Sequence, residues 1–420
     1  MSSAVYVRWQ ADKITQVLQS RRVILLAGPR QCGKTTLAKT LSKDKTIYLT
    51  LDDVTLLDSA IHDPRGFVKH ANELMIIDEV QRAPMLLQAV KQEVDENPVY
   101  GRFMLTGSAN IQSLPSVKES LAVRVSNVRL RPLALGEIHR KSPAFISNAF
   151  NGLFYSTTDG VPKNQLFHDK DSYLQLAFLG GFPEAIAQVN DREVKRWHSD
   201  YLAALMARDL NDVINVKRKD SLNKLIEVLA AWSSKFMDIS AIGTNLSLVR
   251  ATIETYLNAL ETLYLIERVR PWHKTDYDRV SKQDKLFMTD SGLMASILRW
   301  RFEKVRLNGD MNGKLIETFV FGQLTAILDA QDEHYDLYHY RDREKREIDF
   351  LIENEEGELL GIEVKAGSAV NHSAFKHLQW FKNNLAKERS FKGIVFYTGE
   401  HIVPFGEDMW AVPINSLWAS

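Results

Sequence analysis

Short apolar runs alternate with helical stretches along the first part of the chain. The runs predict strands at 23–27, 46–53, 73–79, 102–108 and 121–130. Strands that are apolar along their length are typical of sheets covered on both faces. Because these strands alternate with predicted helices, we expect a parallel, doubly wound α/β domain over residues 1–140.

The next segment is polar and shows no regular spacing of hydrophobic residues at first. Residues 139–172 show no sustained pattern and predict an insertion or linker, whereas 173–216 have helical spacing on both sides of a break. The break falls at 180–183, where two glycines and a proline exclude a continuous helix. We therefore predict a linker and helical region over 141–220.

Helix-turn-helix spacing follows this region. Helices are predicted at 222–232, 239–242 and 247–263, and a strand at 265–270 could form a wing. Together these elements predict a winged-helix-like domain over 221–280.

The sequence does not decide whether this winged-helix-like domain contacts DNA or a protein. Its third helix begins with one base, Arg250, and one acid, Glu254, where a DNA recognition helix should offer several donors. Winged helices also serve as lids and protein-docking modules, so DNA contact and docking are both retained. The basic residues that could contact phosphates are Lys217, Arg218, Lys219, Arg268, Arg270 and Lys274.

A second α/β pattern predicts a separate domain over 281–420. Its first helix contains one acid, Glu317, among apolar residues. Because side chains alternate along a strand, Glu363 and Lys365 are expected to project from the same face. The helix and the strands are predicted at 313–321, 338–341, 347–352 and 359–367.

Composition narrows the class of protein. The 420 residues are 45% hydrophobic and 25% charged, as in globular proteins, and no run approaches a membrane span. The N-terminus lacks the pattern of a secretory signal, and the single cysteine, Cys32, fits a reducing cytoplasm. With 53 basic and 53 acidic residues, the net charge gives no sign of nucleic-acid binding.

Residues 28–35 fit the phosphate-binding motif G-x-x-x-x-G-K-[ST] between a predicted strand and a predicted helix. Gly28 and Gly33 let backbone N–H groups approach phosphate oxygens, Lys34 supplies a positive charge, and Thr35 can join the shell of a magnesium ion. The alternative is an ordinary strand-to-helix turn. The predicted nucleotide-binding residues are Gly28, Pro29, Arg30, Gln31, Cys32, Gly33, Lys34, Thr35, Thr36 and Thr106.

Two acids end the third predicted strand. Asp78 is expected to orient magnesium beside the phosphates, and Glu79 to polarise the attacking water, although adjacent acids can also form a plain strand-end turn. The fourth strand ends in Thr106 and Ser108, which could sense the γ-phosphate or cap the following helix.

Four motifs resemble a family of prokaryotic AAA-type ATPases. They are the stretch 76–84, Leu-Thr-Gly-Ser at 105–108, Gly-Gly-Phe-Pro-Glu at 180–184 and Arg-Asp-Leu at 208–210. The resemblance covers nearly the whole chain and implies binding and hydrolysis of ATP with Mg²⁺ in a homo-oligomer. It also implies a C-terminal domain similar to restriction-endonuclease-like nucleases.

An arginine completes the ATP site of AAA-type proteins, from the same or a neighbouring subunit. The resemblance makes Arg124 and Arg208 the candidates, although either could instead form a structural ion pair. Val123 stands where the family pattern has glycine.

The C-terminal acids resemble the PD-(D/E)XK nuclease pattern. Asp349 precedes Glu363 and Lys365 on the next predicted strand, and Glu317 adds an acid from the helix. In that chemistry the carboxylates hold Mg²⁺ or Mn²⁺ and the lysine positions the hydroxide. The alternative is an exposed strand face that alternates acid and base.

The sequence as a whole predicts a cytoplasmic ATPase with three parts and no membrane segment. Its nuclease-like domain is expected to cut or bind nucleic acid, DNA being the candidate, under nucleotide control. A switch whose C-terminal domain binds a protein or DNA without cleavage is the alternative.

Overall fold

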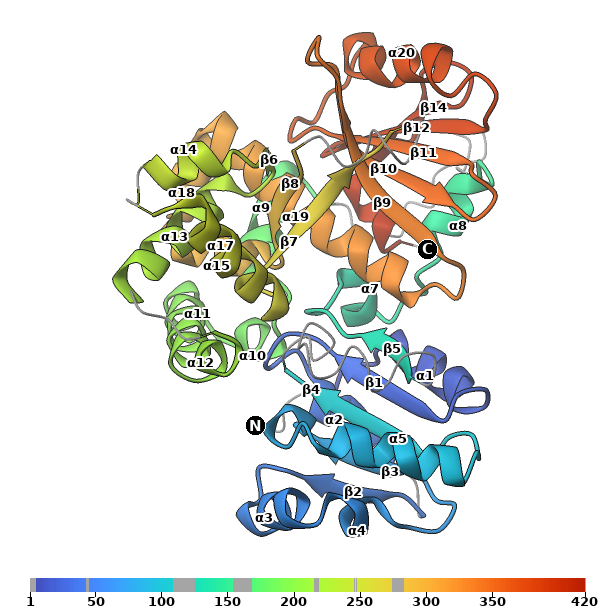
Figure 1. The fold of residues 1–420 in the computed structure, drawn as a ribbon. Helices are drawn as coiled ribbons and strands as arrows, with labels where there is room; N and C mark the ends of the chain where they lie inside the picture. The colour runs from blue at the N-terminus through green and yellow to red at the C-terminus, as the bar shows by residue number, and fades with distance from the viewer. Residues whose placement is uncertain are drawn as a thin grey trace.

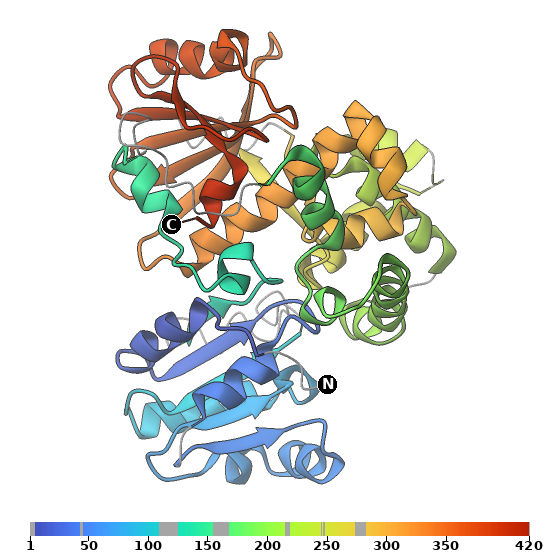
Figure 2. The same cartoon turned by 180° about the vertical axis from the view of Figure 1, so that it is seen from behind.

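The computed structural model describes residues 5–42, 45–108, 125–153, 168–214, 219–244, 246, 248–273 and 283–419, without the side chains of residues 208, 211, 212 and 219. Figure 1 shows three parts: an N-terminal sheet domain at the bottom, a helical part at the left and a C-terminal sheet domain at the upper right. The view from behind in Figure 2 shows the same arrangement. None of the described helices is long and apolar enough to cross a membrane.

Five described strands form the N-terminal sheet, in the order β2-β3-β4-β1-β5, and all neighbours are parallel. This confirms the predicted parallel α/β sheet. Because β4 lies between β1 and β3, the carboxyl ends of these three strands meet at one edge. The strands are β1 (Val23–Ala27), β2 (Ile47–Thr50), β3 (Met75–Asp78), β4 (Phe103–Gly107) and β5 (Val125–Arg129).

Helices cover both faces of this sheet. Alternate residues of β1 pack on opposite sides, with Val23 and Leu25 in one apolar cluster and Ile24 and Leu26 in the other. The wholly apolar strand of the sequence therefore reflects burial on two faces. One face is covered by α1 (Gln10–Leu18) and α2 (Lys34–Leu41); the other by α3 (Val54–His62), α4 (Pro64–Val68) and α5 (Leu86–Glu96), and η1 (Val80–Arg82) follows β3.

The region predicted as a linker contains a buried helix, α8 (Phe145–Phe150). Phe145, Ile146, Ala149 and Phe150 are buried in the large apolar cluster, so this part of the predicted insertion or linker belongs to the packed core. The helix is too short to show a sustained period. The other helices here are α7 (Leu135–Ile138), α9 (Lys170–Leu179), α10 (Pro183–Ile186), α11 (Asp191–Ala204), the π-helical η4 (Leu205–Asp209) and α12 (Leu210–Val213).

The following segment has the order helix, strand, helix, helix, strand, strand. Its elements are α13 (Lys219–Trp232), β6 (Lys235–Phe236), α14 (Ile239–Thr244), α15 (Arg250–Thr262), β7 (Ile266–Pro271) and β8 (Lys285–Met288). Strand β8 pairs antiparallel with both β6 and β7. The predicted wing strand β7 also pairs with β9, so it is an inner strand of a larger sheet rather than a free edge.

Nine described strands make this larger sheet, in the order β13-β14-β12-β11-β10-β9-β7-β8-β6. The sheet therefore continues across residue 281, where the sequence predicts a domain boundary. Figure 1 shows β7 reaching from the helical part to the C-terminal strands. The strands are β9 (Tyr335–Arg341), β10 (Glu347–Asn354), β11 (Leu359–Val364), β12 (Phe391–Tyr397), β13 (Val403–Pro404) and β14 (Met409–Pro413).

The long helix α19 (Gly309–Ala330) lies among all three parts. It packs against α9 and β11, and it also contacts α1 of the N-terminal domain. Helix α20 (Lys376–Asn384) belongs to a second apolar cluster on the other face of the sheet. The remaining elements are α17 (Ser291–Ile297), α18 (Phe302–Leu307), η5 (His372–Phe375) and η6 (Ile414–Leu417).

The Gly-Gly-Phe-Pro-Glu segment joins the parts through its backbone. Gly181 N donates to the buried carboxylate of Asp290 (2.7 Å), and Gly181 O accepts from Leu133 N (2.7 Å). The same Asp290 carboxylate caps α17 through Leu293 N (2.7 Å). Burial raises the pKa of Asp290 despite these bonds. The segment therefore has a structural role at the meeting point of three chain regions.

Candidate nucleotide site and carboxylate cluster

Backbone geometry shapes the loop at 28–35. A side chain at Gly28 would clash with Leu130 O, so only glycine fits this close approach to the end of β5. Gly33 has φ +103° and leads directly into α2. The first N–H groups of α2 therefore face the loop, which is the arrangement that binds anions.

Lys34 is folded back over this loop. Its side chain is buried and donates to Gly28 O (3.0 Å) and Pro29 O (2.8 Å). Within the described ranges Lys34 forms no ion pair, so its charge is free for an anionic ligand. Neutral carbonyl acceptors hold the ammonium only modestly, and phosphate oxygens would attract it more strongly.

Asp78 lies at the end of β3 under a shell of hydroxyl groups. Its Oδ2 accepts from Thr35 Oγ1 (2.9 Å) and Tyr48 OH (2.7 Å), and its Oδ1 accepts from Thr106 Oγ1. Burial and the bond to Asp78 raise the pKa of Tyr48, so this hydroxyl stays a donor. No ion pair reaches Asp78 from any residue that the structure describes. The side-chain partners of this buried carboxylate, beside the loop at 28–35, are thus neutral hydroxyl groups.

Glu79 has the left-handed backbone conformation, with φ 60° and ψ 43°. Its N–H donates to Thr106 Oγ1 (3.2 Å), and its carboxylate accepts from Gln81 Nε2, which also donates to Ser108 Oγ (2.9 Å). Thr106 and Ser108 thus orient the two acids. Sequence reasoning missed Tyr48, because only the fold brings it to Asp78, and it missed Gln81, which is two residues from Glu79 but matches no motif position.

Of the three arginines predicted to lie at the nucleotide site, the structure describes the side chain of Arg30. Arg30, expected to line the nucleotide pocket, forms an ion pair with Asp209 of η4 (2.8 Å) and so joins the loop to the helical part. The predictions for Arg124 and for the Arg208 side chain lie outside the described residues. Thr36 is exposed on α2, whereas Cys32 is buried.

A buried lysine stands within the predicted C-terminal metal site. Lys285 Nζ lies 2.6 Å from Glu317 Oε1 and 2.9 Å from Asp349 Oδ1. Asp349 Oδ2 also accepts from Val364 N (2.9 Å). The pairing of β10 with β9 shifts register between Ile348 and Leu351, and such a bulge re-aims the side chain at 349.

Glu363 and Lys365 form a second ion pair in this cluster, with Lys365 Nζ 2.9 Å from Glu363 Oε2. Burial and the charge of Asp349 raise the pKa of Glu363 to about 8, and burial raises that of Glu317 to about 7. Burial would also raise the pKa of Asp349, but the charges of Lys285 and Lys365 hold it below its usual value.

These residues do not fit the predicted divalent metal site. The described residues contain no group of three or more His, Cys, Asp and Glu side chains placed to hold a metal ion. The predicted ligands Glu317, Asp349 and Glu363 instead lie in contact with the ammonium groups of Lys285 and Lys365. Sequence reasoning missed Lys285 because it lies 64 residues from Asp349 and matches no nuclease motif.

Comparison with known proteins gives three family matches. Residues 20–139 match a model described as AAA domain, and these residues contain the phosphate loop, Asp78 and Glu79. This part of the chain is therefore similar to an AAA domain. Residues 170–304 and 312–417 match two domains of unknown function, DUF8612 and DUF4143.

Two curated relatives are similar along most of the chain. They are uncharacterized protein Rv2008c of Mycobacterium tuberculosis and uncharacterized protein Mb2031c of Mycobacterium bovis. Each is 24% identical over 408 residues, and the match covers 97% of this chain and 83% of the relative.

Three solved structures illustrate the similarity in fold. The Walker-type ATPase PABY2304 of Pyrococcus abyssi has 14% identity and TM-score 0.42, covering 70% of this chain and 96% of its own. The Thermotoga maritima RuvB Holliday junction branch migration motor has 15% identity and TM-score 0.27, covering 63% and 90%. AMPPCP-bound DnaA from Aquifex aeolicus has 13% identity and TM-score 0.29, covering 60% and 86%.

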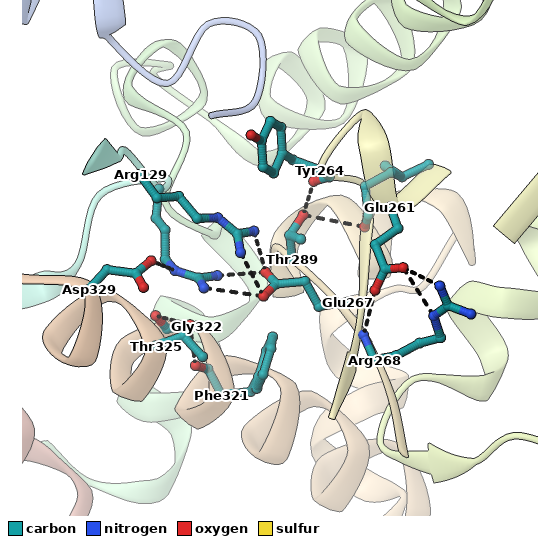
Figure 3. Close-up of polar contacts among 12 residues, drawn as sticks. Arg129, Glu261, Tyr264, Glu267, Arg268, Thr289, Phe321, Gly322, Thr325 and Asp329 are labelled. Carbon is teal, nitrogen blue, oxygen red and sulfur yellow. Dashed lines mark hydrogen bonds and ion pairs between the residues drawn. The ribbon is translucent and has the colours of Figure 1, made fainter. Parts of the chain in front are cut away.

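The AAA domain is joined to the other parts by an arginine network (Figure 3). Glu267 of β7 accepts from Arg129 (2.7 Å) at the end of β5 and from Arg131 (2.5 Å), which also pairs with Asp329 of α19 (2.5 Å). Burial opposes ionisation of Glu267, but the two guanidinium groups lower its pKa to about 2. Glu267 therefore stays charged at neutral pH.

This network also reaches the phosphate loop. The buried guanidinium of Arg8 donates to Cys32 O (2.7 Å) in the loop and to Arg131 O (2.6 Å), and it pairs with Glu137 (2.9 Å). Beside it, β5 pairs with β1 so that Arg129 faces Ala27, directly before the loop. A continuous set of hydrogen bonds and ion pairs therefore connects the loop with β7 and α19. Sequence reasoning missed Arg8, whose partners are distant in the chain.

Proposed function

We propose that the AAA domain binds Mg-ATP in the loop at 28–35 and hydrolyses it with Glu79 as the general base. The observation that supports this most strongly is Asp78, a buried carboxylate beside the loop with only hydroxyl partners in the described structure. Thr35 and Asp78 would hold magnesium, which would neutralise charge on the phosphates as the bond to the γ-phosphoryl group breaks.

Each neighbouring residue has a definite task in this proposal. Lys34 exchanges its two carbonyl partners for phosphate oxygens, since an ion pair is stronger than those neutral contacts. Gln81 restrains the Glu79 carboxylate before substrate binds and releases it toward the attacking water. Arg124 or Arg208 supplies the positive charge at the γ-phosphate, from the same chain or from a neighbouring copy in a homo-oligomer.

We propose further that residues 221–280 with β8 form a winged-helix-like unit and that 281–420 are nuclease-like. The helix, strand, helix, helix, strand, strand order supports the first assignment. For the second, α19 precedes antiparallel β9, β10 and β11, with Asp349 on β10 and Glu363 at the end of β11. Together they would bind or cut DNA in the cytoplasm under nucleotide control.

One observation favours the alternative of a switch that binds its partner without cleavage. Lys285 pairs with two of the three acids that a metal-dependent nuclease would need. A lysine that already balances these charges removes much of the attraction for a divalent ion. The test is nuclease activity on DNA with Mg²⁺ or Mn²⁺, compared with Asp349→Ala and Lys365→Ala. Equal signals in all three proteins support the switch.

The ATPase proposal is tested by steady-state hydrolysis. We expect Glu79→Gln to keep Mg-ATP binding but lose about 10²- to 10⁴-fold in kcat, because a general base contributes that much. Glu73→Gln is the matched control, because Glu73 lies before the amino-terminal end of β3, away from the loop. This variant should keep normal turnover. Normal hydrolysis by Glu79→Gln would reject Glu79 as the base.

A further inference from the structure

Lys285 is an unusual member of the carboxylate cluster. Only 3% of its side chain is exposed, and its ammonium lies 5.7 to 5.8 Å from the ring centres of Phe236, Phe287 and Phe350. A lysine so deeply buried is rare unless anions hold it. Here Glu317 and Asp349 do so from a helix and a strand on different segments of the chain.

The position of this ammonium bears on metal binding. A magnesium ion bridging two carboxylates lies about 2.1 Å from its ligand oxygens, so it would occupy the space between Glu317 and Asp349. Lys285 Nζ already stands there, 2.6 Å from one acid and 2.9 Å from the other. The ion and the ammonium cannot both occupy this space, and their like charges would repel at such a distance.

The remaining acid of the cluster has its own cation. Glu363 pairs with Lys365, whose side chain is 42% exposed and can move toward solvent. Lys285 cannot, because aromatic rings surround it and its strand β8 pairs on both sides. The two lysines therefore differ: one can be displaced by a ligand and the other is a fixed part of the core.

We infer that Lys285 is a built-in cation that takes the place of a divalent metal ion between Glu317 and Asp349. The native cluster is then held together by an ammonium group and excludes Mn²⁺ and Mg²⁺. This inference concerns a cluster outside the proposed ATP site. It rests on the nuclease-like assignment only because that assignment names Mg²⁺ and Mn²⁺ as the ions to test. Failure of ATP hydrolysis would leave it unchanged, whereas metal-dependent cleavage that Asp349→Ala abolishes would contradict it.

The experiment is Mn²⁺ binding to the nucleotide-free full chain, followed by electron paramagnetic resonance of the free ion. We expect the wild-type chain and Asp349→Asn to bind equal numbers of Mn²⁺ ions. Lys285→Met should bind one Mn²⁺ ion more than the wild-type chain, and Lys285→Met/Asp349→Asn should lose this added site again. Lys235→Met, on the neighbouring strand β6 and exposed, is the matched control and should gain nothing.

Two results would overturn the inference. One is a wild-type chain that binds one Mn²⁺ more than Asp349→Asn, which would place a metal in the native cluster. The other is a folded Lys285→Met that gains no site, because Lys285 would then not be the group that excludes the ion. If Lys285→Met fails to fold, the comparison of wild type with Asp349→Asn still decides the first point.

Discussion

Asp78 and Asp349 are both strand acids with little exposure to water, and sequence patterns predict a metal ligand at each. Their surroundings differ. Asp78 accepts hydrogen bonds from three hydroxyl groups, which are neutral, while Asp349 shares a lysine ammonium with Glu317. A hydroxyl shell orients a carboxylate without cancelling its charge, whereas an ammonium satisfies it. The two sites therefore differ in the partners of the acid: neutral hydroxyl groups at Asp78 and a positively charged ammonium group at Asp349.

Replacing Lys285 by methionine should cost much more stability than replacing Lys34. Lys285→Met would leave Glu317 and Asp349 buried without a counter-ion, so we expect unfolding free energy to fall by about 3 to 5 kcal/mol. Lys34→Met removes only contacts to carbonyl groups and should change stability by about 1 kcal/mol or less. Chemical denaturation of the two variants measures the difference, with Lys235→Met as a surface control.

Equal stability of Lys285→Met and the wild-type chain would mean that the acids are paired in another way in solution. A strong loss of stability in Lys34→Met would mean that the lysine is structural rather than held ready for a ligand. Either result would remove the contrast between the two sites.

A second variant tests whether the two regions communicate. Glu267→Gln removes the charge between Arg129 and Arg131, and we expect a loss of about 2 kcal/mol because the arginines are partly buried. Mg-ATP should slow hydrogen exchange in α19 of the wild-type chain and have a smaller effect in this variant. Glu254→Gln, in the exposed pair with Arg250, is the control. If Mg-ATP slows hydrogen exchange in α19 equally in Glu267→Gln and in the wild-type chain, Glu267 does not connect the two regions.

The third prediction concerns pH. Glu363 has a pKa raised from 4.5 to about 8, so the folded chain binds more protons than the unfolded chain between these values. Unfolding free energy should therefore fall as pH rises from about 5 to 8, by up to about 1.4 kcal/mol per pH unit from this group. Glu363→Gln mimics the protonated acid and should flatten the slope, leaving the part due to Glu317. Thermal melts across this range measure it.

The exposed Glu356→Gln should keep the wild-type slope. An unchanged slope in Glu363→Gln would mean that the Glu363 carboxylate is ionised in the folded chain across this pH range.

Sequence patterns predicted the features that depend on neighbouring residues. Each of these features forms from adjacent residues and so appears as a short motif. They are the strands of the N-terminal sheet, the loop at 28–35 and the acids at the end of β3. Gln81 lies only two residues from Glu79, but no motif gave it a role. Two other partners of the acids were not visible, because Lys285 and Tyr48 are distant in the chain from Asp349 and Asp78. The inner position of β7 was missed for the same reason, since strand pairing to β9 depends on the tertiary fold.

Calorimetric titration of the purified chain with Mg-ATP tests whether the loop at 28–35 binds nucleotide. We expect heat from nucleotide bound at the loop, an interaction that Lys34→Ala abolishes and that Lys91→Ala, at a half-buried position of α5, leaves intact. No heat from the wild-type chain, or equal binding by Lys34→Ala, would contradict this expectation.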